Sequence, residues 1–545
     1  MAGSGFIGEE IRVESPDVIY TDTEILSYYN YHDSHIRGNV VTPTMERLVF
    51  KTQRQLPKTG LLLVGWGGNN GTTLTAGILA NKLNVTWNTK EGLNHPNYLG
   101  SICKSVTMRV GIDDRFMPVY APLNNVVPLL NPNDLEIWGW DISSVNMGDA
   151  MRRAKVLDWD LQRQLYSNLK EMLPWPSVYI PEWIAANQSD RADNCLKGTK
   201  KEMLNALRQN IKDYKNSRRL DKVVIVWTAN TEKFALIKPG VNDTADNLLR
   251  AIENNSPDIS PSTLFAVASI LESCTYINGS PQNTFVPGCI ELSERYHVLI
   301  AGDDFKSGQT KIKSVLSDFL INSGLKLQSV VSYNHLGNND GKNLSAPETF
   351  RSKEISKSGV IDDVVRANRL MYKSNESPDH CVVIKYVPYV GDSKRAMDEY
   401  ISEIFMGGRN TISMHNTCED SLLAAPIILD LVILAELCTR IQVKRDKDEE
   451  FTKMHPVMSL LSFLLKSPQV PPGSPVVHML FPQRYAITLL KSPQVPPGSP
   501  VVHMLFPQRY AITNFFKALI GLPPENFMML EHKVPSLRMC KTVNA

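Results

Sequence analysis

A glycine-rich turn between an apolar stretch and a helical stretch constrains this chain more than any other feature. Residues 60–64 are apolar and predict a buried strand, glycines follow at positions 65, 67 and 71, and residues 72–83 predict a helix. Glycines in such a turn let the backbone approach a phosphate closely, and the helix directs N–H groups and its positive dipole end toward the anion. The pattern predicts a dinucleotide pyrophosphate site, although an ordinary strand-to-helix turn explains the same letters about equally well.

The length and charge of the chain narrow its domain count and its partners. At 545 residues it is too long for one simple core, so we expect two or three domains. The 58 basic and 56 acidic residues nearly cancel and leave a net charge of +2. A balanced charge favours neither nucleic acid nor a membrane surface as the main partner, so we expect a small molecule.

Cysteine spacing and the distribution of apolar residues bear on the compartment. The cysteines form no close pairs, which predicts neither a disulfide framework nor a zinc site and favours a reducing compartment. Residues 1–5 lack the basic and apolar pattern of a secretory signal. The apolar run 421–438 is interrupted by Pro426, Asp430 and Glu436, so we interpret it as a buried helix rather than a membrane span. The eight cysteines are Cys103, Cys195, Cys274, Cys289, Cys381, Cys418, Cys438 and Cys540.

Apolar strands alternate with amphipathic helices through the first 300 residues, which predicts an α/β fold with a parallel sheet covered on both faces. An acid about 20 residues after the last glycine normally binds the adenosine ribose. Glu91 lies at that distance, but residues 88–90 do not resemble a strand. Asp141 directly follows a strand-like segment and is the better candidate, with a helix or turn cap as an equally weighted alternative. Strands are predicted at residues 61–64, 135–140, 223–227 and 296–301.

A second phosphate seat is predicted where residues 302–310 lead into a helix. Ser307 and Thr310 supply hydroxyls, Gln309 supplies an amide, and the first-turn N–H groups are suited to a dianion. Simple capping of the helix by Ser307 is about equally plausible on this segment alone. The helix itself is supported by apolar residues at helical spacing, namely Ile312, Val315, Leu316, Phe319 and Leu320.

Three lysines stand in polar, glycine-bearing surroundings. Lys353 and Lys357 are four residues apart, so a helix would place both on one face, and Lys394 follows Gly391. Such a pair is more often a solvated surface. However, residues 334–341 and 416–420 concentrate hydrogen-bonding side chains beside apolar elements. If the lysines converge on one phosphate, each lowers its neighbours' pKa and favours a neutral amine suited to general-base catalysis.

Taken together, these motifs resemble the myo-inositol-1-phosphate synthase family in the same order over nearly the whole chain. The segments that carry the resemblance are residues 65–71, 226–231, 283–288, 304–310, 332–341, 391–394 and 521–524. The resemblance implies a Rossmann-like NAD-binding domain with an inserted α+β domain for catalysis and tetramerisation. It also implies a redox-neutral conversion of D-glucose 6-phosphate to 1D-myo-inositol 3-phosphate by oxidation, enolisation, intramolecular aldol closure and reduction, with NAD kept bound throughout.

The resemblance also assigns roles to residues. Lys353 is expected as acid/base at the carbon 5 oxygen with help from Asp304, and Lys466 is expected to stabilise the carbon 1 oxygen. Asp340 and Asp420 are expected to orient the lysines. Catalytic residues implied by the family are Lys353, Lys466, Lys394, Lys357, Asp304, Asp340 and Asp420. Substrate-phosphate ligands implied are Ser307, Gly308, Gln309, Thr310, Lys357 and Lys394. Cofactor-binding residues implied are Gly65, Gly67, Gly68, Asn69, Asn70, Gly71, Asp141, Thr228, Ala229, Asn230, Thr231 and Asp304. The family site also holds a cation, for which a monovalent ion such as ammonium is a candidate, but no metal ligands are predicted.

An exact tandem repeat departs from the family pattern. Residues 464–488 recur unchanged as residues 489–513, whereas the family has the segment once. Two copies are too few for a solenoid, so a recent duplication or a sequence-assembly error is the simplest explanation. The family lysine therefore maps to both Lys466 and Lys491. We favour Lys466 because residues 458–463 before it match the family, whereas the helix at 514–519 continues naturally only from the second copy. A surface loop absorbs extra residues at modest entropic cost.

The resemblance predicts four segments of the chain, and two other functions compete with that of a synthase. The segments are residues 1–48 as the N-terminal part of the core, 49–310 as the NAD domain, 311–423 as the catalytic and tetramer domain, and 424–545 as the C-terminal part of the core. A cytoplasmic homotetramer is implied. The alternatives are an ordinary NAD-dependent sugar-phosphate dehydrogenase, which would release reduced NAD, and a catalytically impaired NAD-binding homologue.

Overall fold

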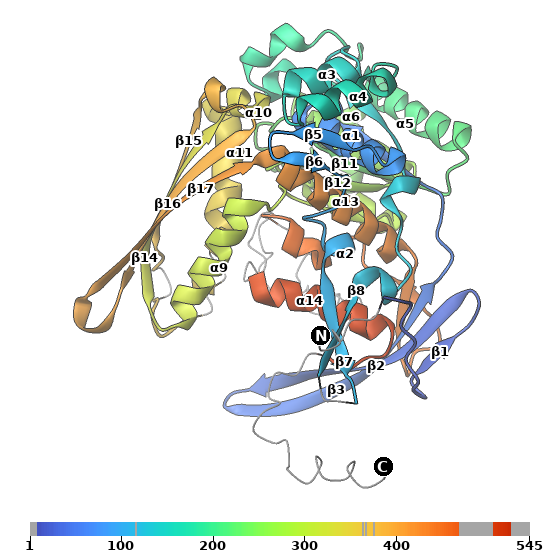
Figure 1. The fold of residues 1–545 in the computed structure, drawn as a ribbon, viewed down its shortest axis with the longest axis vertical. Helices are drawn as coiled ribbons and strands as arrows, with labels where there is room; N and C mark the ends of the chain where they lie inside the picture. Colours follow the sequence, from blue (N-terminus) through green and yellow to red (C-terminus); the bar gives the residue numbers. More distant parts are fainter. Residues whose placement is uncertain are drawn as a thin grey trace.

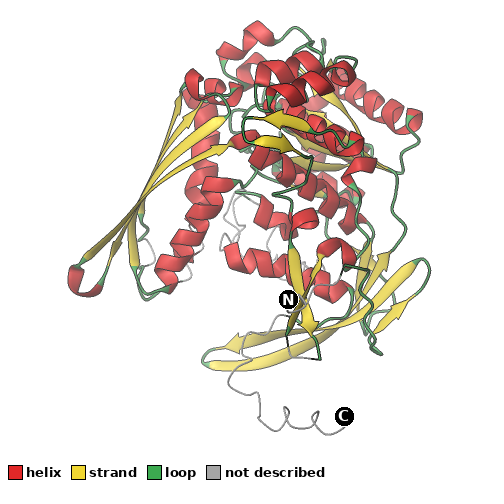
Figure 2. Cartoon of the chain, viewed as in Figure 1, coloured by secondary structure: helices red, strands yellow, loops and turns green. Residues whose placement is uncertain are grey.

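The computed structural model describes residues 8–114, 117–361, 364–365, 368–373, 376–467 and 505–524. It contains a parallel sheet, a mixed sheet and an antiparallel sheet, arranged around long helices (Figures 1 and 2). The predicted α/β class is confirmed.

The parallel sheet has six strands in the spatial order β10-β9-β4-β11-β12-β13, and each neighbouring pair is parallel. Numbered along the chain, this order is 3-2-1-4-5-6, the doubly wound order of dinucleotide-binding domains. The strands are β4 (Thr59–Val64), β9 (Glu136–Asp141), β10 (Trp175–Pro176), β11 (Lys222–Trp227), β12 (Thr275–Asn278) and β13 (Ile300–Ala301).

Helices cover both faces of this sheet because successive side chains of its buried strands point to opposite sides. Leu61 and Leu63 belong to one apolar cluster, whereas Leu62 and Val64 belong to the other, and all four are fully buried. The first cluster includes residues of α1 (Asn69–Leu83), α3 (Met147–Ala154), α4 (Trp159–Leu169) and α13 (Asp420–Thr439). The second includes residues of α5 (Lys200–Ser217), α6 (Ala245–Glu253), α7 (Pro261–Leu271) and α8 (Pro287–Tyr296).

Two local predictions were wrong. The predicted strand 296–301 is only β13 (Ile300–Ala301), because α8 continues to Tyr296 and ends where His297 adopts a left-handed conformation with φ 51°. Residues 88–90 were expected not to form a strand, but β5 (Trp87–Thr89) pairs with β6 (Gly92–Asn94). This short hairpin lies outside the parallel sheet, because its strands hydrogen-bond only to each other in a separate two-stranded sheet.

The mixed sheet has the order β15-β14-β16-β17 and extends away from the parallel sheet in Figure 1. Its strands are β14 (Lys326–Leu336), β15 (Asp379–Tyr386), β16 (Ser393–Glu403) and β17 (Arg409–Glu419). The helices beside it are α9 (Gly308–Asn322), α10 (Asn339–Asn343) and α11 (Pro347–Ser358). The helix predicted after Ser307 and the placement of Lys353 and Lys357 on one helix are therefore confirmed.

The antiparallel sheet joins segments that are far apart in the sequence. β18 pairs with β3, so a strand from the C-terminal part of the chain lies beside one from the N-terminal part in the order β1-β2-β3-β18-β19. These strands are β1 (Val18–Tyr20), β2 (Glu24–Arg37), β3 (Val40–Gln53), β18 (Ile441–Arg445) and β19 (Thr452–Lys453). The remaining elements include α2 (Ile102–Ser105), the hairpin β7 (Thr107–Ile112) and β8 (Pro118–Pro122), and α14 (Leu505–Leu519).

Helix α13 passes a length and hydropathy test for a membrane span, with a mean hydropathy of 2.2, yet 78% of that window is buried inside the structure. Its apolar residues pack on α1 and β11, and its Asp430 accepts hydrogen bonds from the N-terminus of α2. The interpretation of residues 421–438 as a buried helix agrees with this packing. The seven cysteines in the described residues are all free thiols, whereas Cys540 lies outside them.

Candidate active site

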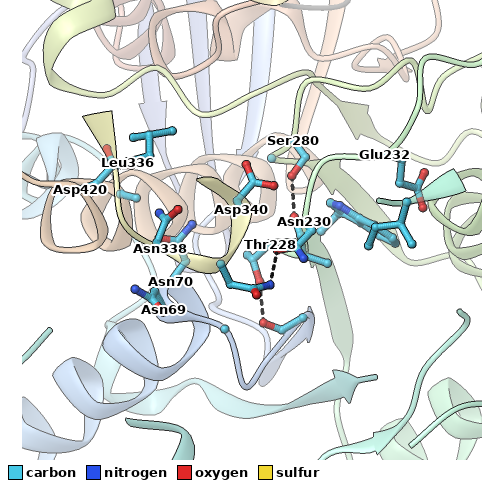
Figure 3. Close-up of a pocket in the computed structure, with 18 of the residues that line it drawn as sticks. Asn69, Asn70, Thr228, Asn230, Glu232, Ser280, Leu336, Asn338, Asp340 and Asp420 are labelled. Atoms are coloured by element: carbon cyan, nitrogen blue, oxygen red, sulfur yellow. Dashed lines mark hydrogen bonds between the residues drawn. The ribbon is translucent and has the colours of Figure 1, made fainter. Parts of the chain in front are cut away.

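A cavity of about 540 Å3 lies where the carboxyl ends of β4 and β11 meet the loops of the mixed sheet. Its volume is in the range of small-molecule and cofactor sites. Strands β4 and β11 flank the point where the strand order of the parallel sheet reverses, which is where such sheets bind ligands. Figure 3 shows Asn69, Asn70, Thr228 and Asp340 gathered around this cavity.

The glycine-rich turn leads from β4 into α1 along one wall of the cavity. Gly65 has φ 82°, and a Cβ atom there would lie 2.5 Å from the Cα of Ala229, so only glycine fits. A Cβ on Gly71 would lie 2.1 Å from the carbonyl oxygen of Trp66. Gly68 occupies the N-cap position of α1 and has no side chain to accept the first-turn N–H groups. The open helix N-terminus therefore fits the phosphates of the predicted dinucleotide.

Asp141 adopts the turn cap, one of the two interpretations that the sequence left open. The end of β9 places it beside the glycine turn, where its Oδ2 accepts the backbone N–H of Gly67 at 2.9 Å. Its Oδ1 accepts the N–H of Ser143 at 2.9 Å, which is a turn cap. Asp141 is buried but lines the cavity, and Arg191 lies 3.7 Å from its Oδ1. A carboxylate that is already positioned at this wall fits a ribose hydroxyl.

The polar loop after β11 lies beside the glycine-rich turn that follows β4. Thr228 donates its backbone N–H to the carbonyl oxygen of Val64 at 2.9 Å, which ties the ends of the two central strands together. Thr231 is fully buried and donates its N–H and hydroxyl to the two carboxylate oxygens of Asp340, at 2.8 and 3.0 Å. Because Asp340 belongs to α10, which packs against β14 and β15, these bonds fix the loop of the parallel sheet to the mixed sheet.

A buried carboxylate shared by two lysines is the central electrostatic feature. Oδ1 of Asp304 accepts Lys353 Nζ at 3.0 Å and Lys466 Nζ at 3.2 Å, and Ser356 donates its hydroxyl to Oδ2 at 2.8 Å. Burial opposes ionisation of Asp304, but the two lysines outweigh it and lower the pKa of the carboxyl to about 2. Asp304 also has φ 63°, a left-handed conformation rare outside glycine.

The two lysines that share Asp304 differ in charge state. Burial opposes the charge of Lys353, but Asp304 and Asp340 outweigh it and raise the pKa of the lysine. Burial lowers the pKa of Lys466 to about 7, and the neighbouring lysines reinforce that effect. Lys353 is therefore an ammonium at neutral pH, whereas Lys466 is present in both charged and neutral forms.

The other two predicted lysines lie at different depths, one in the cavity lining and one behind it. Lys394 lines the cavity and pairs with Asp420 at 3.3 Å. Desolvation opposes ionisation of Asp420, but Lys394 and the neighbouring lysines outweigh it and hold the pKa of this half-buried carboxyl below its usual value. Lys357 is buried and donates to Asn334 at 2.8 Å and to Gln309 at 3.4 Å. Burial lowers the pKa of Lys357 far below that of a free lysine, with Lys394 next in effect.

The predicted phosphate seat is divided between the cavity wall and the layer behind it. Ser307 lines the cavity at the N-cap position of α9, but its side chain accepts no first-turn N–H. The alternative interpretation, in which the Ser307 hydroxyl caps the helix, is therefore wrong. Gln309 donates to Asp398 at 2.7 Å. Predicted site residues outside the cavity lining, among the described residues, are Gly67, Gly71, Thr231, Gly308, Gln309, Thr310 and Lys357. Lys491 lies outside the described residues.

Sequence reasoning missed several residues that line the same cavity. Glu232 directly follows the predicted loop 228–231, so its position at the end of that polar run was the available signal. Asp392 lies inside the motif that contains Lys394, but it was given no role. Arg153 and Arg191 approach the Asp141 end of the cavity and have no recognisable spacing in the sequence. No cluster of potential metal ligands is present among the described residues.

Comparisons with known proteins agree with this arrangement. A family model for NAD-binding proteins described as myo-inositol-1-phosphate synthase matches residues 59–489. Inositol-3-phosphate synthase of Dictyostelium discoideum is 54% identical over 96% of this chain and 99% of its own length. Inositol-3-phosphate synthase 1 of Homo sapiens is 55% identical over 98% and 92%, respectively. The crystal structure of inositol-3-phosphate synthase from Caenorhabditis elegans has a TM-score of 0.90, 47% identity, and coverage of 97% of this chain and 99% of that chain. The chain therefore belongs to the myo-inositol-1-phosphate synthase family.

Proposed function

We propose that this protein converts D-glucose 6-phosphate to 1D-myo-inositol 3-phosphate, as an NAD-dependent isomerase at the entry to inositol biosynthesis. The observation that carries the proposal is one cavity lined both by the glycine turn and by Lys353, Lys394 and Lys466. An ordinary dehydrogenase needs a dinucleotide site and one acid/base. Several cations beside the dinucleotide turn suit a reaction that also develops enolate and alkoxide charge.

NAD, when bound, supplies the oxidation of carbon 5 and the later reduction of the same carbon. The residues proposed to hold its phosphates are Gly65, Gly68, Asn69 and Asn70, which line the cavity beside the open N-terminus of α1. Asp141 is proposed to bind the adenosine ribose. Thr228, Ala229 and Asn230 line the same cavity as Asp304, and these four residues are proposed to enclose the nicotinamide end.

Lys353 and Asp304 are proposed to move the proton of the carbon 5 hydroxyl. Lys353 Nζ and Asp304 Oδ1 are 3.0 Å apart, so the ammonium can pass one proton to the carboxylate and take up the proton of the carbon 5 hydroxyl in its place. The two transfers run in reverse when the proton is returned to the same oxygen at the end. The pair therefore needs no net exchange of that proton with solvent.

Lys466 and Lys394 are proposed to stabilise negative charge during ring closure. A fixed ammonium in a water-poor site stabilises a developing alkoxide more strongly than water does. Lys466 would face the carbon 1 oxygen, while Asp420 and Asp340 keep the neighbouring cations in place. Sharing of Asp304 by Lys353 and Lys466 links the groups proposed for carbon 5 and carbon 1.

The phosphate of the substrate is proposed to bind at the start of α9. Ser307 and Lys394 reach the cavity directly, and the N-terminus of α9 adds its dipole. Lys357 and Gln309 lie behind this wall and are hydrogen-bonded to each other. They would therefore support the phosphate site from the layer behind the cavity wall. Gly308 and Thr310 belong to the first turn of the same helix and complete the proposed seat.

We further propose that the protein is a homotetramer and that the mixed sheet contributes to its interface. Val383, Tyr333 and Met397 are register partners across three adjacent strands, and their exposed fractions are 37%, 48% and 41%. Apolar side chains in one row on an open sheet face are typical of a contact surface. A charged residue at Met397 should dissociate the oligomer, as measured by sedimentation, whereas the same change at the exposed Leu99 should not.

The remaining family expectations are also proposals. The domain boundaries 49–310 and 311–423 would separate the parallel and mixed sheets, with segments 1–48 and 424–545 forming the shared core. A cytoplasmic location and a monovalent cation such as ammonium at the cofactor site are likewise proposed. Replacement of ammonium by a large organic cation in the assay tests the cation requirement.

The decisive experiment incubates the purified chain with glucose 6-phosphate and NAD and measures inositol phosphate together with net reduced NAD. A matched chain lacks residues 489–513, so it has one copy of the repeat. Product from both without net reduced NAD supports the synthase and a tolerated duplication. Product only from the shortened chain means that the duplication impairs the site. Net reduced NAD without inositol phosphate would favour a dehydrogenase.

A variant pair tests the proposed acid/base. Lys353→Ala should lower product formation by about 10²–10⁴-fold, the usual contribution of a positioned acid/base. Lys90→Ala is the matched control because its side chain is 90% exposed. Equal activity of the two variants would contradict the role of Lys353.

A further inference from the structure

Asp392 contacts both halves of the cavity. It precedes β16, is 8% exposed, and lines the cavity between the glycine turn and the Lys394–Asp420 ion pair. Gly391 before it has φ 55° and ψ −127°, a conformation open only to glycine, and thereby sets the path of the loop. A Cβ on Gly337 would lie 2.3 Å from the N atom of Gly391, so the neighbouring loop packs tightly against this turn.

The carboxylate of Asp392 joins two helix N-termini. Its Oδ1 accepts the side-chain amide of Asn69 at 3.1 Å, and Asn69 is the first residue of α1. Its Oδ1 also accepts the hydroxyl of Ser421 at 2.6 Å, and its Oδ2 accepts the N–H of Ser421 at 2.9 Å. Ser421 lies in the first turn of α13, which packs against α1. One carboxylate therefore caps α13 and holds the side chain that begins the cofactor turn.

The backbone of the same residue positions the ion pair. The carbonyl oxygen of Asp392 accepts the N–H of Lys394 at 2.8 Å and the N–H of Asp420 at 3.0 Å. Capping of α13 accounts for the two contacts to Ser421, but it needs neither the contact to Asn69 nor the shared carbonyl. Burial raises the pKa of Asp392, with the hydroxyl and N–H of Ser421 opposing that effect.

We propose that Asp392 is a positioning residue that couples the cofactor turn to the Lys394–Asp420 pair, so that dinucleotide and phosphate strengthen each other's binding. This inference rests on the proposed synthase function. A ligand at the N-terminus of α1 immobilises Asn69, and through Asp392 it also immobilises the backbone that carries Lys394. The second ligand then loses less conformational freedom when it binds, which produces positive coupling.

The test measures the dissociation constant of NAD for the full chain, without and with saturating inorganic phosphate. Binding is monitored by tryptophan fluorescence. The ratio of the two constants is the coupling factor. A direct loss of NAD contacts affects both constants and cancels in the ratio. In the wild-type chain we expect phosphate to tighten NAD binding about fivefold or more, the lower end of usual coupling between sites.

Three variants separate the two sides of Asp392. Asn69→Ala removes only the contact to the cofactor turn, Ser421→Ala removes only the hydroxyl contact to α13, and Asp392→Asn changes both. We expect the coupling factor to fall to about one in Asn69→Ala and Asp392→Asn. In Ser421→Ala we expect the coupling factor to keep its wild-type value, because effects at independent sites add without interacting. A merely structural cap would instead lower thermal stability in Ser421→Ala and Asp392→Asn without changing the coupling factor.

The outcomes distinguish this inference from the proposed function. Wild-type coupling in Asp392→Asn, or a wild-type chain that makes inositol phosphate but shows no coupling, overturns the role of Asp392 alone. A wild-type chain that makes no inositol phosphate overturns the proposed function. If Asp392→Asn does not fold, the Asn69→Ala and Ser421→Ala pair decides the question by itself.

Discussion

Asp304 and Lys466 are joined twice although 162 residues separate them in the chain. The carboxylate of Asp304 accepts Lys466 Nζ at 3.2 Å, and its carbonyl oxygen accepts the backbone N–H of Lys466 at 2.7 Å. Ser467 and Asp303 exchange two further backbone bonds, of 2.6 and 3.0 Å, directly beside them. The first copy of the repeat is therefore anchored to the residue that the candidate site shares between two lysines.

The second copy of the repeat supplies the first part of α14. Gln508 is buried and accepts Lys306 Nζ at 3.2 Å, and Lys306 also donates its backbone N–H to Leu464 of the first copy at 2.9 Å. Ala518 after the repeat accepts the hydroxyl of Ser27 at 2.6 Å. The described structure thus uses the start of one copy and the end of the other, which is the order expected for a single family segment with extra residues between its ends.

Lys466 and Lys491 provide an unusually well-matched comparison, because each lies in the same 25-residue sequence. Lys466→Ala should lower inositol phosphate formation by about 10²–10³-fold, the usual effect of removing one donor to a developing oxyanion. Lys491→Ala should retain wild-type activity. The reverse pattern would assign the site to the second copy, and an effect of neither substitution would remove this lysine from catalysis.

The pKa of Lys466 predicts unusual amine reactivity near neutral pH. Burial lowers that pKa to about 7, so the neutral, nucleophilic form grows as the pH rises through 7. Acetylation by a small anhydride, followed by peptide mass spectrometry, should show a midpoint near pH 7 at Lys466. The same lysine in the chain unfolded by denaturant is the control, with a midpoint of about 10.4, the value of a free lysine. Residues before Lys466 and Lys491 differ, so their peptides are distinguishable. Equal midpoints at Lys466 in the folded and the unfolded chain would contradict the structure.

Glu232 should destabilise the protein increasingly as the pH rises. Burial raises its pKa to about 8, although Ser262 donates its N–H and hydroxyl to the carboxyl group. Below pH of about 4.5 the carboxyl is protonated in both folded and unfolded chains, so it has no effect on stability. Between that pH and about 8 the unfolded chain ionises first, so the folded state loses relative stability, on the order of 3–5 kcal/mol.

A neutral isostere at Glu232 tests this sign. Glu232→Gln should have a thermal midpoint above that of the wild type at pH 8, and the difference should shrink toward pH 5. Glu91→Gln is the control, because the Glu91 side chain is 80% exposed. A wild-type advantage at Glu232 that grows with pH would mean that the carboxylate form is stabilised in the fold.

A buried ion pair fixes α13 to the rest of the structure. Arg440 is 2% exposed, donates to Glu436 at 2.7 Å, and also donates to the carbonyl oxygens of Gln53 and Pro128. Arg440→Leu should lower stability by about 3–5 kcal/mol because it leaves the Glu436 charge buried and without its arginine. The double variant Arg440→Leu, Glu436→Leu should recover much of that loss in thermal denaturation. Equal losses in the single and double variants would show that the carbonyl contacts dominate.

Short-range sequence patterns were sufficient to predict the local elements around the candidate site. Glycines 65, 67 and 71 after an apolar strand, and lysines four residues apart, report on turn geometry and helical phase, which depend on neighbouring residues. The alternation of apolar strands with amphipathic helices likewise predicted a parallel sheet that is covered on both faces. Local prediction was wrong at Tyr296, because a left-handed cap at His297 can end a helix without glycine.

Which of these groups meet, and in what charge state, depends on the folding of the whole chain. Asp304, Lys353 and Lys466 are distant in sequence, and their pKa values depend on burial and on distances of about 3 Å that no spacing rule contains. The hydrogen bond between Asn69 and Asp392 joins residues that are 323 positions apart, so it could not be predicted from sequence spacing either. Sequence patterns encode short-range geometry, whereas the electrostatics of a buried site arise from desolvation and proximity, and both exist only once the chain has folded.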